Sequence, residues 1–184
     1  LNVVNTGAAG AASFTTVKAA TVNLTATGKD LTVNNLVGAT GVTKAVNVAG
    51  DAKVTITADT LDAAAVITST NTKGVVVTQA LAAGQKFVGA AGADTITVPV
   101  IAAGGTGAST VANTLGEGDD TVNITFVTNA ALGTGGSIDG GAGNDTLRVS
   151  GTAGYSTVPG ITGFETLGAG AGASGTFDAT GFTG

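Results

Sequence analysis

The chain has 184 residues and a net charge of −5, with 43% hydrophobic residues, mostly alanine and valine, 4% aromatic residues and 10% charged residues. This composition excludes ordinary disorder, which combines low hydrophobicity with high net charge. The sequence contains no cysteine and no histidine, which excludes disulfides, thiol nucleophiles and histidine-ligated metals.

Short segments with alternating apolar residues recur along the chain, and each predicts a β-strand. In chain order they are residues 21–27, 30–36, 45–50, 53–59, 75–80, 94–100, 120–126 and 145–151. Their β-branched Val, Ile and Thr side chains favour a pleated surface over a helix. Residues 61–67 are expected to form one helical turn at most. The longest uncharged stretches are broken by Gly, Pro and Thr, so no membrane helix is expected.

The spacing of these strands suits a sandwich or barrel, and it equally suits a parallel β-solenoid. Glycine-rich turns recur at a nearly constant period, because Asp120 follows Asp94 by 26 residues and Asp145 follows Asp120 by 25. With its small, uniform side chains, this period predicts a β-solenoid for residues 89–184. For the Thr/Val-rich residues 1–88 a sandwich-like arrangement stays open. We expect one continuous body, and we expect it to be part of a longer polypeptide.

The charges are distributed unevenly between these two regions. Residues 1–88 contain six lysines and four aspartates, a net charge of +2. Residues 89–184 contain eight acidic residues and one arginine, a net charge of −7. An acidic region of this kind indicates a bound cation, and it argues against nucleic acid, which requires a basic surface.

The turn GGAGNDTLR (140–148) matches the calcium-binding nonapeptide G-G-x-G-x-D-x-U-x at every fixed position. Degraded copies, GAAGADTIT and LGEGDDTVN, occupy residues 89–97 and 115–123. Calcium takes six to eight oxygen ligands, and a short turn can supply most of them only as backbone carbonyls. The necessary backbone angles are open mainly to glycine. The pattern therefore predicts calcium sites with the sixth residue of each turn supplying the negative charge.

These turns resemble RTX repeats, the calcium-binding repeats of bacterial proteins exported by type I secretion. In that family, carbonyls one and three plus the sixth-position Asp of one turn face carbonyls two and four plus the Asp of another. The resemblance implies a first site formed by Gly89, Ala91 and Asp94 with Gly116, Gly118 and Asp120. It implies a second site formed by Leu115, Glu117 and Asp120 with Gly141, Gly143 and Asp145. RTX turns usually come in unbroken tandems, whereas these are single turns about 25 residues apart.

The rest of the chain is similar to RTX-bearing bacterial surface-layer (S-layer) proteins. The similarity lies in the abundance of Thr, Val, Ala, Gly and Asn, the absence of Cys, and the segment GFETL (163–167). It implies a non-enzymatic structural module at the bacterial cell surface, made rigid by Ca²⁺. The implied partners are identical copies in a two-dimensional lattice, and cell-surface polysaccharide through segments outside this chain, with no membrane insertion. The alternative is a calcium-folded module of a secreted RTX adhesin or hydrolase.

Several acidic residues have a simpler interpretation. Turn capping would explain an aspartate in any β protein, but the threefold recurrence argues against it for the motif aspartates. Capping is the preferred interpretation for Asp30, Asp51, Asp59 and Asp62, and Glu165, which follows Gly-Phe, is expected to be structural. The only arginine, Arg148, suggests a calcium-dependent polysaccharide lyase, but on a strand it more often marks the solvent side.

Overall fold

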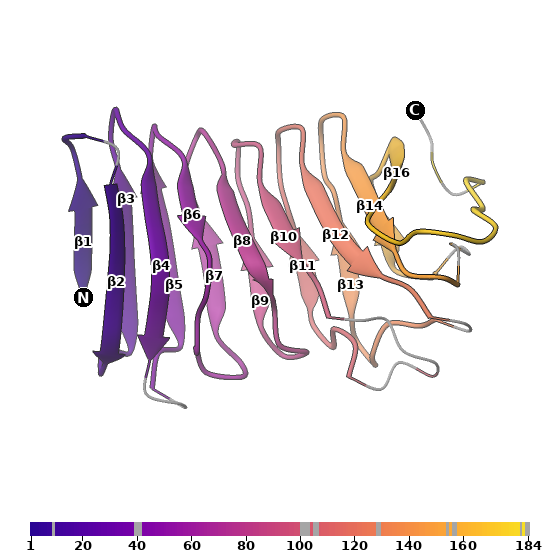
Figure 1. Cartoon of the computed structure of the whole chain (residues 1–184), viewed down its shortest axis with the longest axis horizontal. Coiled ribbons are helices and arrows are strands. Elements are labelled where there is room, and N and C mark those ends of the chain that lie inside the picture. Colours follow the sequence, from indigo (N-terminus) through magenta and orange to yellow (C-terminus); the bar gives the residue numbers. More distant parts are fainter. Residues whose placement is uncertain are drawn as a thin grey trace.

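The computed structural model describes residues 1–184 except 9, 39–41, 100–103, 105–106, 128–129, 154, 156–157, 181 and 183–184. Its described residues form strands and turns, with no helix, and so no helix that could cross a membrane. Two eight-stranded parallel sheets face each other and run along the long axis of a β-solenoid, whose coils stack along that axis (Figure 1). The prediction of a parallel β-solenoid is confirmed.

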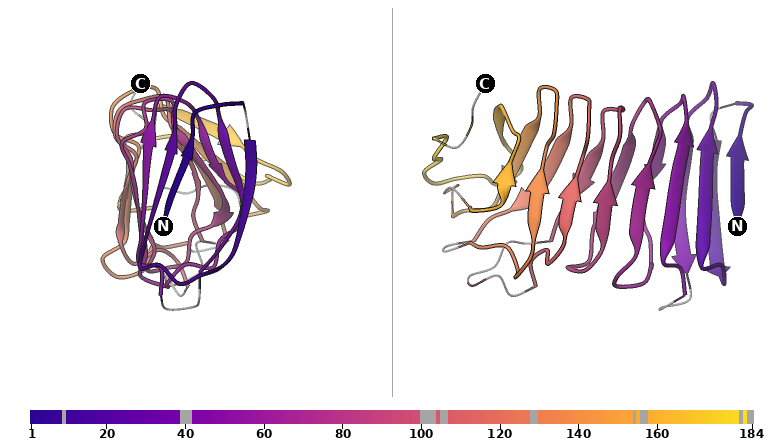
Figure 2. Two further views of the ribbon diagram at one scale, coloured as in Figure 1. Left: turned by 90° about the vertical axis from the view of Figure 1, so that its left-hand side faces the viewer. Right: turned by 180° about the vertical axis from the view of Figure 1, so that it is seen from behind.

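Each coil of the solenoid contributes one strand to each sheet. The odd-numbered sheet contains β1 (Asn2–Asn5), β3 (Thr21–Ala26), β5 (Ala45–Gly50), β7 (Val66–Ser69), β9 (Lys86–Val88), β11 (Ala112–Thr114), β13 (Ser137–Asp139) and β15 (Ile161–Thr162). The even-numbered sheet contains β2 (Gly10–Val17), β4 (Leu31–Gly38), β6 (Val54–Ile56), β8 (Val75–Ala80), β10 (Thr95–Thr97), β12 (Thr121–Thr125), β14 (Thr146–Ser150) and β16 (Thr166–Ala169). Seen end-on, the coils superpose as a flattened tube (Figure 2).

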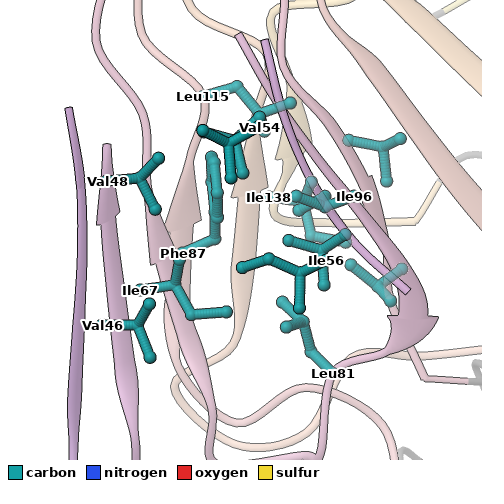
Figure 3. Close-up of a cluster of buried hydrophobic side chains, with 14 of the residues drawn as sticks. Val46, Val48, Val54, Ile56, Ile67, Leu81, Phe87, Ile96, Leu115 and Ile138 are labelled. Atoms are coloured by element: carbon teal, nitrogen blue, oxygen red, sulfur yellow. The ribbon is translucent and has the colours of Figure 1, made fainter. Parts of the chain in front are cut away.

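The core fills the space between the two sheets. In the strands between the two ends of the solenoid, alternate residues point inward and are buried, as the pattern of β3 shows with Val22, Leu24 and Ala26. Figure 3 shows valine, isoleucine and leucine side chains from neighbouring coils packed around Phe87. Small inward side chains let successive coils stack closely, so each coil is stabilised mainly by its two neighbours.

The sandwich-like alternative for residues 1–88 is wrong, because β1 to β8 pair in parallel within the same two sheets as the later strands. The helical turn expected within residues 61–67 is also absent. The Asp62 carboxylate accepts a hydrogen bond from Ala64 N–H at 2.9 Å, and its carbonyl accepts one from Ala65 N–H at 3.0 Å. This tight turn leads directly into β7, where Ile67 pairs with Val46 of β5.

Close stacking makes particular glycines indispensable. Gly141 has a φ of 104°, and a Cβ there would lie 2.0 Å from the Gly116 carbonyl oxygen of the preceding coil. We expect Gly141→Ala to lower the free energy of unfolding by about 2–4 kcal/mol, through a strained backbone and an overpacked contact. Denaturant unfolding measures the loss. Gly7→Ala is the control, since a Cβ at Gly7 meets nothing within 4 Å, and equal effects of the two changes would contradict the prediction.

Candidate functional site

The three turns with the nonapeptide pattern lie side by side along the upper edge of the solenoid in Figure 1. The first motif turn (89–97) connects β9 to β10, the second (115–123) connects β11 to β12, and the third (140–148) connects β13 to β14. Stacking follows from the parallel register, in which Thr95 pairs with Thr121 and Thr121 with Thr146. The residue before each of these threonines is the sixth-position aspartate, so the register aligns all three.

The register also extends this alignment in both directions. Thr146 pairs with Thr166, which places Glu165 beside the third aspartate. We call the resulting set the acidic column: Asp94, Asp120, Asp145 and Glu165. Towards the N-terminus the same position holds the apolar column, whose members are Leu31, Val54 and Val75. One line of buried or half-buried side chains therefore changes from apolar to acidic between β8 and β10.

The carboxylates of the acidic column form a ladder of hydrogen bonds along the solenoid axis. Each accepts a bond from the backbone N–H at the equivalent position of the preceding coil. Val75 N–H donates to Asp94 Oδ1 at 2.7 Å, and Asp94 N–H donates to Asp120 Oδ1 at 2.6 Å. Asp120 N–H donates to Asp145 Oδ1, and Asp145 N–H donates to Glu165 Oε2, both at 2.8 Å. In the apolar column a backbone carbonyl of the next coil accepts the corresponding bond instead: Val54 N–H donates to the Gly74 carbonyl.

The second oxygen of each aspartate, Oδ2, has no hydrogen-bond partner and is buried in Asp94, Asp120 and Asp145. We call these three atoms the inner oxygens. The aspartates themselves are at most 1% exposed. Buried carboxylate oxygens without partners are costly, because desolvation is uncompensated. An ionised acidic column consequently needs a positive charge, and the inner oxygens fit a hard cation.

Burial has a direct effect on the acidity of these groups. Desolvation raises the pKa of Asp94 and of Asp120 from the ordinary 3.8 to about 7, and the neighbouring negative charges of the column add to the effect. Desolvation also raises the pKa of Asp145, with a further contribution from Glu165. Without a cation, burial therefore shifts all three groups towards the protonated form.

The metal-free protein is therefore expected to lose stability as the pH rises from about 4 to about 7. In this window folded Asp94 and Asp120 hold protons that the unfolded chain has released, so the stability falls with rising pH. Below pH 4 both aspartates are protonated in the folded and in the unfolded chain. Above pH 7 both are ionised in the folded chain, and its stability is lowered by the full cost of two buried charges. Melting temperatures in metal-depleted buffer measure the slope. The double variant Asp94→Asn/Asp120→Asn should flatten it, and a melting temperature that rises through the window would contradict the prediction.

The carbonyls of the motif turns face the gaps between turns in a definite order. The Gly116 carbonyl accepts a hydrogen bond from Ala142 N–H at 2.8 Å, so it faces the third turn. The Leu115 carbonyl faces the first turn, because a Cβ on Gly89 would lie 1.8 Å from it and 2.5 Å from Asp94 Oδ2. The RTX resemblance implies the opposite order, with Gly116 in the first site and Leu115 in the second. In the structure the Leu115 carbonyl lies between the first and second turns, and the Gly116 carbonyl lies between the second and third.

The other predicted ligands occupy the same stack. The Gly118 carbonyl would lie 1.9 Å from a Cβ on Gly143, so it too faces the third turn. The side chains of Ala91 and Glu117 are exposed, and Glu117 contributes its backbone N–H to the Ala90 carbonyl of the first turn. In the described part of the chain no three His, Cys, Asp or Glu side chains cluster as a metal site. Any site here must combine two carboxylates with backbone carbonyls.

Two residues of this edge were not predicted as functional. Glu165 lacks the preceding glycine pair, but Glu-Thr-Leu repeats the Asp-Thr-apolar ending of the motif turns and was a usable signal. Asn71, fully buried in the turn before β8, donates Nδ2 to the carbonyls of Ala49 and Ala52 at 3.3 and 2.7 Å. Its Oδ1 accepts from Lys73 and Gly74 N–H. A neutral amide thus satisfies two carbonyls at the turn of the preceding coil and two N–H groups of its own turn without a cation.

No family model matches the chain, and no curated protein matches it in sequence. Arg148, the residue that a lyase would need, is exposed on β14, whose inward residues are Leu147 and Val149. The Arg148 side chain therefore lies on the outer face of the sheet, whereas the inner oxygens are buried.

Proposed function

We propose that the chain is a calcium-bound structural module of a bacterial surface layer, with Ca²⁺ making the coils rigid and promoting contacts between identical copies. The observation that carries this proposal is the row of inner oxygens: three buried carboxylate oxygens, without hydrogen-bond partners, on successive coils. A cation between coils would neutralise the acidic column and give these oxygens a partner.

The available donors favour calcium over other cations. They are carboxylate and backbone carbonyl oxygens, which are hard ligands. Carbonyls contributed by turns give an irregular set, which Ca²⁺ tolerates and the octahedral preference of Mg²⁺ does not. In the first gap the candidate ligands are Asp94, Asp120 and the Leu115 carbonyl. In the second they are Asp120, Asp145 and the Gly116 carbonyl, so Asp120 is common to both sites.

The outer surfaces suit repeated weak contacts with identical copies. A row of threonines crosses the even-numbered sheet, where Thr95, Thr121, Thr146 and Thr166 are in register. On the other sheet Asn23 Nδ2 donates to Asn2 at 2.6 Å, and Asn47 Nδ2 donates to Asn23 at 2.8 Å. Only 10% of all residues are charged, so the surface has few charges that would oppose association. Flat, neutral, hydrogen-bonding sheets of this kind support the S-layer proposal.

Calcium titration followed by light scattering tests the assembly. We expect the parent protein to associate reversibly as Ca²⁺ reaches the millimolar range typical of extracellular sites, and to disperse when a chelator is added. Electron microscopy of the assembled material should then show ordered sheets. A parent protein that stays monomeric at millimolar Ca²⁺ and high protein concentration would instead favour the secreted adhesin or hydrolase module.

A further inference from the structure

The last coil reproduces the geometry of the first motif gap, although its turn lacks the nonapeptide. At the first gap a Cβ on Gly89 would lie 1.8 Å from the Leu115 carbonyl oxygen and 2.5 Å from Asp94 Oδ2. At the last gap, between the third motif turn and the turn before β16, the corresponding glycine is Gly140. A Cβ there would lie 1.9 Å from the Gly163 carbonyl oxygen and 2.8 Å from Asp145 Oδ2. In both the first and the last gap, therefore, a glycine α-carbon lies beside a carbonyl of the next coil and a buried carboxylate oxygen.

The carboxylate oxygen Oδ2 of Asp145 lies at this gap and accepts no hydrogen bond. The residue is 0% exposed. Glu165 lies at the equivalent position of the next coil and accepts the Asp145 N–H bond, as Asp145 does for Asp120. Its turn is shorter than a motif turn, and the additional methylene of glutamate extends the carboxylate towards the backbone of Asp145. The last gap thus has two carboxylates and an adjacent carbonyl.

We propose that Asp145, Glu165 and the Gly163 carbonyl form a third divalent-cation site, beyond the two that the nonapeptide turns imply. The inference rests on the proposed calcium function and extends it by one coil. Its consequence is that Asp145, like Asp120, is shared between two sites, whereas Asp94 and Glu165 each serve one. The row of three proposed cation sites then ends at Glu165, which is the last member of the acidic column in the described part of the chain.

Equilibrium dialysis of the full chain against Ca²⁺, with bound metal measured by elemental analysis, tests this assignment. Glu165→Gln keeps an oxygen that can accept the Asp145 N–H bond but removes the charge, and it should bind one ion fewer than the native chain. Asp51→Asn is the matched control, since Asp51 accepts the Gly28 N–H bond in the N-terminal region, and it should bind as many ions as the native chain. Unchanged binding by a folded Glu165→Gln protein would overturn the third site.

A second comparison decides the matter if Glu165→Gln fails to fold. With three sites, Asp145→Asn should lose two ions and Asp94→Asn should lose one. With only the two motif sites, both variants should lose one, which would overturn the third site. A native chain that binds no Ca²⁺ would overturn the proposed function itself, so the two failures are distinguishable.

Discussion

Removing calcium is expected to lower the melting temperature by roughly 5–10 °C for each site that loses its ion. A ligand present at about 100 times its dissociation constant contributes about 2.7 kcal/mol per site. In a chain of this length, each kcal/mol corresponds to roughly 2–4 °C. The affinity behind this figure comes from an ion that offsets the desolvation of the buried carboxylates and, to a smaller extent, their mutual repulsion.

Thermal unfolding in EDTA and in millimolar CaCl₂, at pH 8, measures this shift. The triple variant Asp94→Asn/Asp120→Asn/Asp145→Asn serves as the control. Its amides keep oxygens that can accept the backbone bonds of the ladder, so it should fold without responding to calcium. Equal melting temperatures of the native chain in the two buffers would contradict the calcium hypothesis.

The second large effect is a spatially divided response to chelation. In metal-free buffer near pH 8, we expect amide hydrogen exchange to become fast in β10, β12 and β14 while β4, β6 and β8 remain protected. Strands β4, β6 and β8 begin with the apolar column. Asn71 connects the turn before β8 to the turn before β6 by hydrogen bonds that need no cation. Later even-numbered strands follow the acidic column, whose ionised members repel one another.

A solenoid allows such a division because each coil depends mainly on its neighbours, so the loss of ions at one end need not unfold the other. Exchange followed by mass spectrometry resolves these strands along the chain. Calcium should restore protection to the acidic coils and leave the apolar ones nearly unchanged. Loss of protection that is uniform along the chain after chelation would show that the coils unfold together, in conflict with the prediction.

The sequence by itself determined the all-β class and the position of the motif turns, because both depend on local patterns. Alternating Val, Ile and Thr residues indicate strands wherever the run is long enough, as in 45–50 and 75–80, which match β5 and β8. The conformational demands of a tight glycine-rich turn are likewise set by consecutive residues of the sequence. Asp94, Asp120 and Asp145 could therefore be selected without coordinates.

Only the tertiary structure decided which residues meet between coils. Strands of three residues, such as β9, β11 and β13, are too short to carry a period, so the odd-numbered sheet was largely invisible in the later half. The parallel register joins residues about 20 to 26 positions apart, which no local pattern records. That register places Glu165 in line with the aspartates and Val75 at the same level, and it determines which gap each carbonyl faces. The change from an apolar to an acidic column is thus a property of stacking, since the side chains involved become neighbours only when the coils are superposed.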